Sequence, residues 1–207
     1  MTDPKLTRRD FLRDSTIYGG GLWISLSLPR PNAARAAAES SQRAVLTEAE
    51  WVTVEAITGR IIPTDHEPGA IEAHCVNFID KALAHEDAQA RPLYALGVAG
   101  TEQVAQRRFG RDFSKLVPAE KDLVLVALEQ GDAPGWPEGP VSSAAFFATV
   151  RAHTILGFLA DPKYGGNRDF AGWKVVGYPG PRHHLGGYTP DQMLGRARIK
   201  TVWGEDL

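Results

Sequence analysis

The chain has 207 residues, a formal net charge of −2 and an apolar content of 43%, which favours one globular domain with an ordinary core. The near-neutral balance excludes the strongly basic surface of a nucleic-acid-binding protein. A single cysteine, Cys75, excludes an intramolecular disulfide, a haem-attachment C-x-x-C-H motif and a cysteine cluster for zinc or iron–sulfur.

The first 38 residues differ in charge from the rest of the chain. They hold six basic and three acidic side chains, which leaves 17 basic and 22 acidic ones on residues 39–207. A basic head before an acidic body is typical of a cleavable export signal. The apolar run from Ser15 to Leu28 has 14 residues, too few to cross a bilayer, which needs about 20. The small residues at 36–38 then provide a cleavage site of the A-x-A kind.

A pair of arginines identifies the kind of signal. The segment around Arg8, Arg9, Phe11 and Leu12 resembles the twin-arginine signal, the address of the bacterial exporter for folded proteins. We therefore predict a twin-arginine signal peptide at 1–38, export to the periplasm by the twin-arginine translocase, and a single helical domain at 39–207. The alternative is an amphipathic N-terminal helix of the mature fold, which the glycines and prolines of this segment disfavour.

The first predicted helix of the mature domain has a strong start. Thr47 and Glu50 have the spacing of a capping box, and the helix should run on to Pro63, which ends it. The turn-rich loop that follows carries Asp65, His66 and Glu67. These three could ligate a metal, but consecutive residues rarely converge on one ion, so a capped surface loop is the favoured interpretation.

Two further helices are predicted at 71–84 and 92–109. Cys75 falls on the apolar stripe of the first, together with Ile71, so we expect a buried, inert thiol rather than a nucleophile. The second carries Gly97 and Gly100 in its interior, and we expect the close approach of another backbone to compensate for them.

The most apolar helix should start at Ser142 or Ser143 and run to about Ala160, after a shorter helix that begins at Pro118 and ends before Gly131. Its apolar side chains surround most of it, which predicts a central helix. His153 lies in line with this apolar face, and a hydrogen-bonded core histidine is favoured over a catalytic base. No segment alternates like a strand, so the predicted fold is all-α, a compact bundle of about five main helices with a short terminal helix from Pro190 to about Ala197.

The stretch from Asp161 to Tyr188 has an unusual composition. It holds 7 glycines and 3 prolines in 28 residues, which we take to exclude regular helix or strand, together with five aromatic residues. Because aromatic side chains bury large apolar areas, we expect this long loop to pack against the core or against a partner. The aromatic residues are Tyr164, Phe170, Trp173, Tyr178 and Tyr188.

Several segments resemble the gluconate 2-dehydrogenase subunit 3 family. The matching segments are 46–50, 60–65, 68–70, 161–169, 172–174 and 177–180. The resemblance implies a small subunit of a membrane-associated, flavin-dependent dehydrogenase that oxidises a sugar, sugar acid or polyol. A large subunit of the glucose–methanol–choline type would carry FAD, a cytochrome c subunit would carry haem c, and this chain would carry no cofactor. The small subunit would escort the large one through the twin-arginine route and help it mature, while the tail at 181–207 has no counterpart in the resemblance.

We therefore assign no catalytic, cofactor-binding or metal-binding residue to this chain. The predicted partner-binding residues are Tyr164, Gly165, Gly166, Asn167, Trp173 and Tyr178. One alternative gives Trp173 or Tyr164 a direct role at the partner's active-site rim or in its electron path. Another, from a different class, is an independent hydrolase or metal enzyme that uses His66, His153, His183 or His184.

Overall fold

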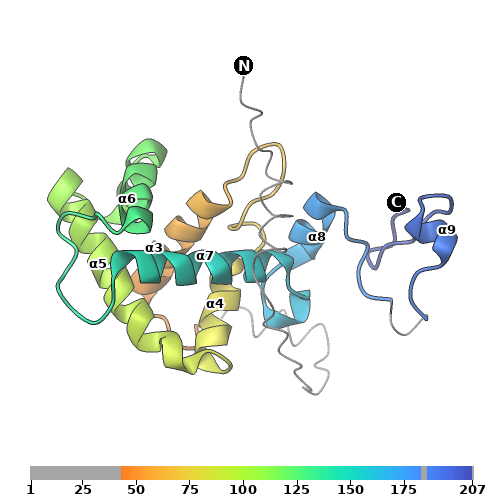
Figure 1. The fold of residues 1–207 in the computed structure, drawn as a ribbon, viewed down its shortest axis with the longest axis horizontal. Helices are drawn as coiled ribbons and strands as arrows, with labels where there is room; N and C mark the ends of the chain where they lie inside the picture. The colour runs from red at the N-terminus through yellow and green to blue at the C-terminus, as the bar shows by residue number, and fades with distance from the viewer. Residues whose placement is uncertain (1–42, 183–185, 207) are drawn as a thin grey trace.

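The computed structural model describes residues 43–182 and 186–206, and within them it is all-α, as predicted (Figure 1). The predicted signal peptide with Arg8, Arg9, Phe11 and Leu12 lies outside these residues, as do His183 and His184. Seven α-helices and no strand are present in the described residues. The helices are α3 (Glu48–Ile61), α4 (Cys75–Ala84), α5 (Arg91–Phe109), α6 (Pro118–Gln130), α7 (Ser143–Leu159), α8 (Ala171–Val176) and α9 (Pro190–Met193). None of them is long and apolar enough to span a membrane.

Helix α7 is the central helix, as its sequence predicts. It contacts α3, α4, α5, α6 and α8, and Figure 1 shows it running across the middle of the molecule. Phe146, Val150 and Phe158 on it are fully buried. Ser142 caps its first turn by accepting a hydrogen bond from the backbone N–H of Ala145. The segment directly after Leu159 therefore continues from a central helix with a largely buried face.

Two sets of hydrogen bonds hold the start of α3 in place. The predicted capping box is present, since the Thr47 and Glu50 side chains each accept from the other's backbone N–H. In addition, the fully buried carboxylate of Asp80 on α4 accepts hydrogen bonds from the backbone N–H groups of three consecutive residues, Ala44, Val45 and Leu46. These hydrogen bonds join residues that are 34 to 36 positions apart, so the local sequence around Ala44 does not predict them.

Helix α4 begins four residues later than predicted. Residues 70–74 form hydrogen-bonded turns, and His74 adopts a left-handed conformation with φ of 58°, which an α-helix cannot contain. Ile71, predicted on the buried stripe, is 48% exposed as a result. Cys75 is fully buried, as predicted, and burial raises the pKa of its thiol far above the ordinary value.

The two glycines inside α5 are compensated by aromatic rings and not, as predicted, by another backbone. A Cβ atom on Gly97 would lie 2.0 Å from the Phe146 ring, and one on Gly100 would lie 2.8 Å from the Trp136 indole. Trp136 comes from the loop between α6 and α7 and donates its indole N–H to the carbonyl of Val141. The glycines therefore make room for large side chains that fill the core next to α7.

Candidate functional site

The segment predicted as a structureless loop is a compact corner that contains a helix. Asp161 caps a 3-10 turn (Pro162–Tyr164) by accepting from the backbone N–H of Lys163, a second such turn follows (Arg168–Phe170), and α8 comes directly after it. The prediction that glycine and proline exclude helix here is wrong. Helix α8 contains Gly172 because only a residue without a side chain fits against α7 at that point: a Cβ atom would lie 1.8 Å from the carbonyl oxygen of Phe158.

Asn167 holds this corner together. Its side chain is fully buried and donates to the carbonyl of Ala160, just after α7, over 2.8 Å. Its side-chain oxygen accepts from the backbone N–H of Gly172 in the first turn of α8, also over 2.8 Å. The backbone of Asn167 is left-handed, with φ of 46°, a conformation that asparagine tolerates better than most residues. One amide thus joins the C-terminus of α7 to the N-terminus of α8.

Gly165 and Gly166 bring the corner against two helices. The carbonyl of Gly165 accepts from the buried Asn77 side chain of α4 over 2.7 Å. Gly166 packs directly on the α7 backbone, because a Cβ atom there would lie 2.2 Å from the carbonyl oxygen of Gly157. The predicted site residues Gly165, Gly166 and Asn167 therefore act inside this chain, where they shape the corner.

The aromatic residues stack along the outside of the corner. Trp173 is 6% exposed, donates its indole N–H to the carbonyl of Leu159 over 2.7 Å, and stacks on Phe170 with ring centroids 5.7 Å apart. Tyr178 meets the Trp173 ring edge-on at 5.0 Å and is 38% exposed. The prediction that these aromatic residues are packed is confirmed, and of the Trp173–Tyr178 pair it is Tyr178 that faces solvent.

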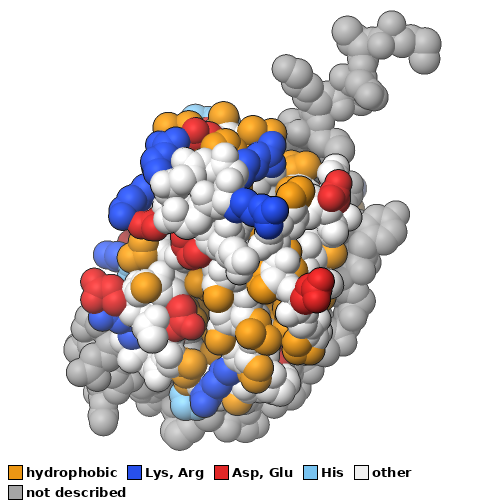
Figure 2. Space-filling model, turned by 90° about the vertical axis from the view of Figure 1, so that its left-hand side faces the viewer, with side chains coloured by type: hydrophobic (Ala, Val, Ile, Leu, Met, Phe, Trp, Pro, Cys, Tyr) orange, Lys and Arg blue, Asp and Glu red, His pale blue; other side chains and the backbone are white. Residues whose placement is uncertain are grey.

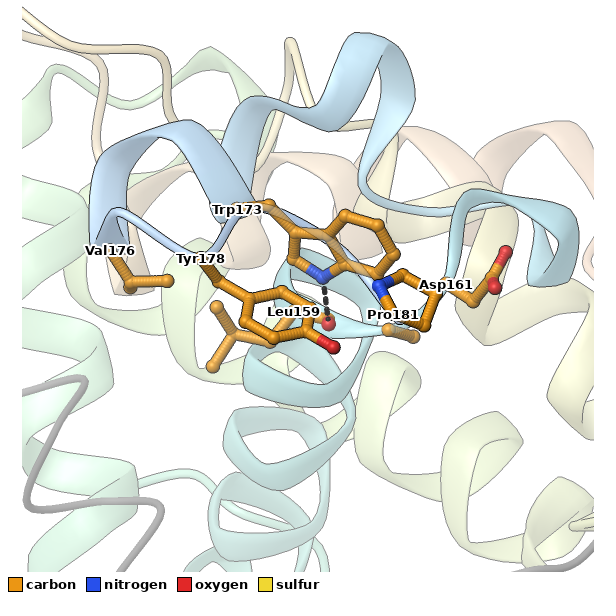
Figure 3. A pocket seen from close by; sticks show the side chains of 7 residues that line it. Leu159, Asp161, Trp173, Val176, Tyr178 and Pro181 are labelled. Carbon is orange, nitrogen blue, oxygen red and sulfur yellow. Dashed lines mark hydrogen bonds between the residues drawn. The ribbon is translucent and has the colours of Figure 1, made fainter. Parts of the chain in front are cut away.

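A groove of about 460 Å³ opens beside these rings (Figure 3). Its lining is mainly apolar, and the polar side chains on it are the Asp161 carboxylate and the Tyr178 hydroxyl. The lining residues are Leu159, Ala160, Asp161, Trp173, Val176, Tyr178 and Pro181. Burial, and then the nearby Tyr188 and Asp161, raise the pKa of Tyr178, so its hydroxyl stays a hydrogen-bond donor at neutral pH. This lining suits an apolar side chain that carries a polar end, and it offers no paired nucleophile and base.

The C-terminal tail adds an aromatic ring that the sequence analysis missed. Trp203 packs on Phe170 with ring centroids 5.4 Å apart. The backbone N–H of Val202 donates to the carbonyl of Pro179, and the Val202 side chain covers Gly180. Val202 and Trp203, from the tail that the family resemblance left unexplained, therefore pack against the corner.

Neither His66 nor His153 belongs to a metal or catalytic site within the described part of the chain. His66 is exposed beside Asp65, and the structure brings no group of three metal-ligating side chains together anywhere in residues 43–182 and 186–206. His153 is buried, as predicted for a core histidine. Its Nε2 lies 2.8 Å from the carboxylate of Asp87, and its Nδ1 lies 3.0 Å from the Tyr94 hydroxyl. Because a carboxylate only accepts, Nε2 carries the proton and Nδ1 accepts from the fully buried Tyr94.

We expect this histidine to make the stability of the chain depend on pH. Burial lowers the pKa of His153 below 6.5, and the opposing effect of Asp87 does not restore it. The unfolded chain therefore binds a proton before the folded chain does as the pH falls through about 6.5, so folding stability is highest above that pH and declines below it. The slope from one such group is at most about 1.4 kcal/mol per pH unit.

Guanidinium unfolding at about pH 7.5 and about pH 5.5, one unit above and one unit below the ordinary pKa of histidine, would check this. His153→Gln is the matched variant, because it removes the titration and keeps a polar side chain. A wild-type stability that does not fall more than that of His153→Gln would contradict the expectation.

The family described as gluconate 2-dehydrogenase subunit 3 matches residues 48–180, which include α3 to α8 and end at the Gly180 that the tail covers. No curated protein and no solved structure matches the chain. Since the match spans well over half of the 207 residues, the chain belongs to the gluconate 2-dehydrogenase subunit 3 family.

Proposed function

We propose that this chain is the non-catalytic small subunit of a periplasmic, flavin-dependent dehydrogenase complex that oxidises a sugar, sugar acid or polyol. In the proposal, a large subunit of the glucose–methanol–choline type carries FAD and does the chemistry, and a cytochrome c subunit takes the electrons. This chain escorts the large subunit through the twin-arginine route, stabilises it, and reaches the inner membrane as part of the complex. Family membership supports a place in such a complex.

The observation that carries the proposal is the groove beside α8. Its walls come from the end of α7 and from α8, and Asn167 locks these two helices together, so the groove is a rigid feature that needs no partner to form. Preformed, mainly apolar clefts with one or two polar groups are what a protein partner's anchoring side chain needs. Among the predicted binding residues that carry a side chain, Tyr178 and Tyr164 remain at least partly exposed, and we assign the direct contact to them.

The alternative role at the partner's active-site rim uses the same surface. Trp173 was one of its two candidate residues, and its indole N–H is already bound to Leu159 inside this chain. A Trp173→Ala change would therefore disturb the corner itself, so Tyr164 is the better residue for testing a catalytic contribution. Normal assembly with slowed turnover in a Tyr164→Ala complex would favour this alternative.

The experiment is to co-express the chain with its flavin subunit and to measure that subunit in the periplasm. Replacing Arg8 and Arg9 together by lysine should abolish export of both chains, because the paired arginines are the part of the signal that the exporter recognises. Undiminished periplasmic flavin subunit in the double variant would contradict the escort role.

A second arm tests the groove. Tyr178→Arg fills the groove with a charge at an exposed position, so we expect the chain to fold and to be exported while co-purification of the flavin subunit falls at least about tenfold, as for loss of an interface anchor. Val52→Arg on α3, exposed to a similar degree, is the matched control. Equal co-purification by both variants would exclude the groove as the docking site.

A further inference from the structure

Helix α7 has a solvent-facing side that carries no charge. Its exposed residues are all apolar and recur every three or four positions, so they share one side of the helix. They are Ala145, Ala148, Ala152 and Leu156. In each of α3, α5 and α6, by contrast, at least one charged residue is among the exposed ones, and α4 has no exposed residue. We name the side of α7 that carries these four residues and Leu159 the outer face, which is about 21 Å long at 1.5 Å per residue.

The one arginine of α7 turns away from the outer face. Arg151 is the only Lys, Arg, Asp or Glu in the helix. It pairs with Glu129 of α6 over 2.9 Å and lies over the ring of Phe147, 5.8 Å from its centroid. Its guanidinium group is thus held at the boundary between α7 and α6, where a carboxylate balances its charge. The outer face itself presents only apolar side chains and the hydroxyl of Thr149, which donates to the backbone carbonyl of Ala145.

The end of the molecule formed by α5 and α6 differs from the outer face. Figure 2 shows this end, where acidic and basic side chains lie among the apolar ones. On α6, Leu123 and Val126 are exposed, but Asp122 and Glu129 are the helical neighbours of Val126. Single apolar side chains among charges are ordinary on a protein surface. A continuous uncharged face along the central helix instead indicates a surface that a partner covers.

The outer face continues into the groove beside α8. Leu159, the last residue of α7, lines that groove together with Val176 and Tyr178 (Figure 3). Leu156 lies one turn before Leu159 on the same side of the helix and is 47% exposed, so it connects the alanines to the groove. The whole outer face also lies within residues 48–180, the part of the chain that matches the family. One partner can therefore cover the outer face and the groove together.

The side chains of the outer face fit an α-helix. Its three alanines leave no long side chain between the α7 backbone and a neighbour, so the axis of a second helix can approach to about 8 Å. The backbone of α7 is hydrogen-bonded within its own helix, so the face offers a partner side-chain packing alone. A segment buried there must satisfy its own backbone N–H and C=O groups, which a helix does.

We propose that the outer face and the groove together bind one α-helix of the flavin subunit through an uncharged, apolar side of that helix. The helix packs on the alanines of α7 for about four turns. Near its end, an apolar side chain with a polar end enters the groove, beside Asp161 and Tyr178. This inference rests on the proposed function, because it takes the flavin subunit as the occupant, and it adds the kind of element that docks and a second surface for it.

Ala152→Arg tests the outer face by co-purification of the flavin subunit with the full chain. Ala152 is exposed in the free chain, so the longer side chain reaches solvent and the fold should tolerate it. We expect co-purification to fall at least about tenfold, because the docked helix would bury an unpaired charge. Ala99→Arg, at an exposed alanine of α5, is the matched control and should co-purify like wild type.

The Tyr178→Arg variant separates this inference from the proposed function. If Tyr178→Arg lowers co-purification and Ala152→Arg does not, the groove binds the flavin subunit without the outer face, which overturns the inference and leaves the proposed function standing. If the wild-type chain retains no flavin subunit, the proposed function and the inference both fail.

Thiol labelling provides a second readout that needs no disruptive variant. Ala148→Cys places a thiol on the outer face, and Cys75 stays unlabelled because it is buried. In the complex, labelling at position 148 should be at least about tenfold slower than in the isolated chain, as expected where an interface excludes water. Labelling of an Ala99→Cys variant should be equally fast in both. Equal rates at position 148 would overturn the inference, and so would protection already present in the isolated chain, which would show that a second copy or another segment of this chain covers the face.

Discussion

Replacement of Asn167 by alanine is expected to destabilise the chain by about 3–5 kcal/mol. The change removes the donor to Ala160 and the acceptor for Gly172, and both partners stay in a buried region without water to replace the amide. It also leaves a residue with a Cβ atom in a left-handed conformation that the amide no longer helps to hold. Small domains have a free energy of unfolding of only about 5–15 kcal/mol, so this loss would remove most of the stability of a marginally stable domain.

Asn167→Gly separates the two causes, because glycine accepts the left-handed backbone without strain and lacks the hydrogen bonds. Guanidinium unfolding should rank wild type above Asn167→Gly and Asn167→Gly above Asn167→Ala. The Asn167→Ala chain should also lose the groove, since α8 is no longer tied to α7. A free energy of unfolding within about 0.5 kcal/mol of wild type would mean that the amide does not organise the corner.

The helices that the sequence predicted well are those whose ends carry local chemistry. The capping box of Thr47 and Glu50 predicts the start of α3, and the structure confirms it. In the same way, Pro118 and Gly131 predict the two ends of α6 within a few residues. The short terminal helix shows the limit of this argument. Its capping box at Thr189 is present as predicted, but the helix ends at Met193 and not near Ala197, because Gly195 turns the chain with φ of 70°.

The candidate site was predictable in composition and not in form. The glycines and aromatic residues of 161–180 identified the segment as unusual. Whether Gly172 interrupts a helix or belongs to one depends on how closely α7 approaches it, and the local sequence does not determine that distance. The same holds for His74, whose left-handed backbone delays α4. Trp203 was missed because its partner, Phe170, lies 33 positions earlier in the chain.

The corner also explains why a segment so rich in glycine is not loose. Each glycine there either meets a neighbouring backbone or takes a positive φ, and the aromatic rings close the outer side. Phe170 has a positive φ of 59°, unusual for an aromatic residue, and its ring is held between Trp173 and Trp203. The tail therefore helps to hold the corner whose α8 forms part of the groove.

Gly166→Val is expected to destabilise the chain by about 3 kcal/mol or more. A Cβ atom at this position would lie 2.2 Å from the carbonyl oxygen of Gly157. The backbone fixes the position of the Cβ atom, and the oxygen belongs to the α7 backbone, so neither atom can rotate away. Gly165→Val should cost less in packing, because the atoms that it meets belong to the side chains of Asn77 and Lys81, although its φ of 95° adds strain.

Gly139→Ala is the control for Gly166→Val, since a Cβ atom there meets nothing within 4 Å and the backbone needs no positive φ. Thermal and guanidinium unfolding of the three variants should give Gly166→Val as the least stable, Gly165→Val next, and Gly139→Ala within about 0.5 kcal/mol of wild type. The same order should appear in co-purification with the flavin subunit if the groove is the docking site, because the groove exists only while α8 stays against α7. A Gly166→Val chain that melts with wild type and still co-purifies would show that the contact between this corner and α7 is dispensable for both stability and assembly.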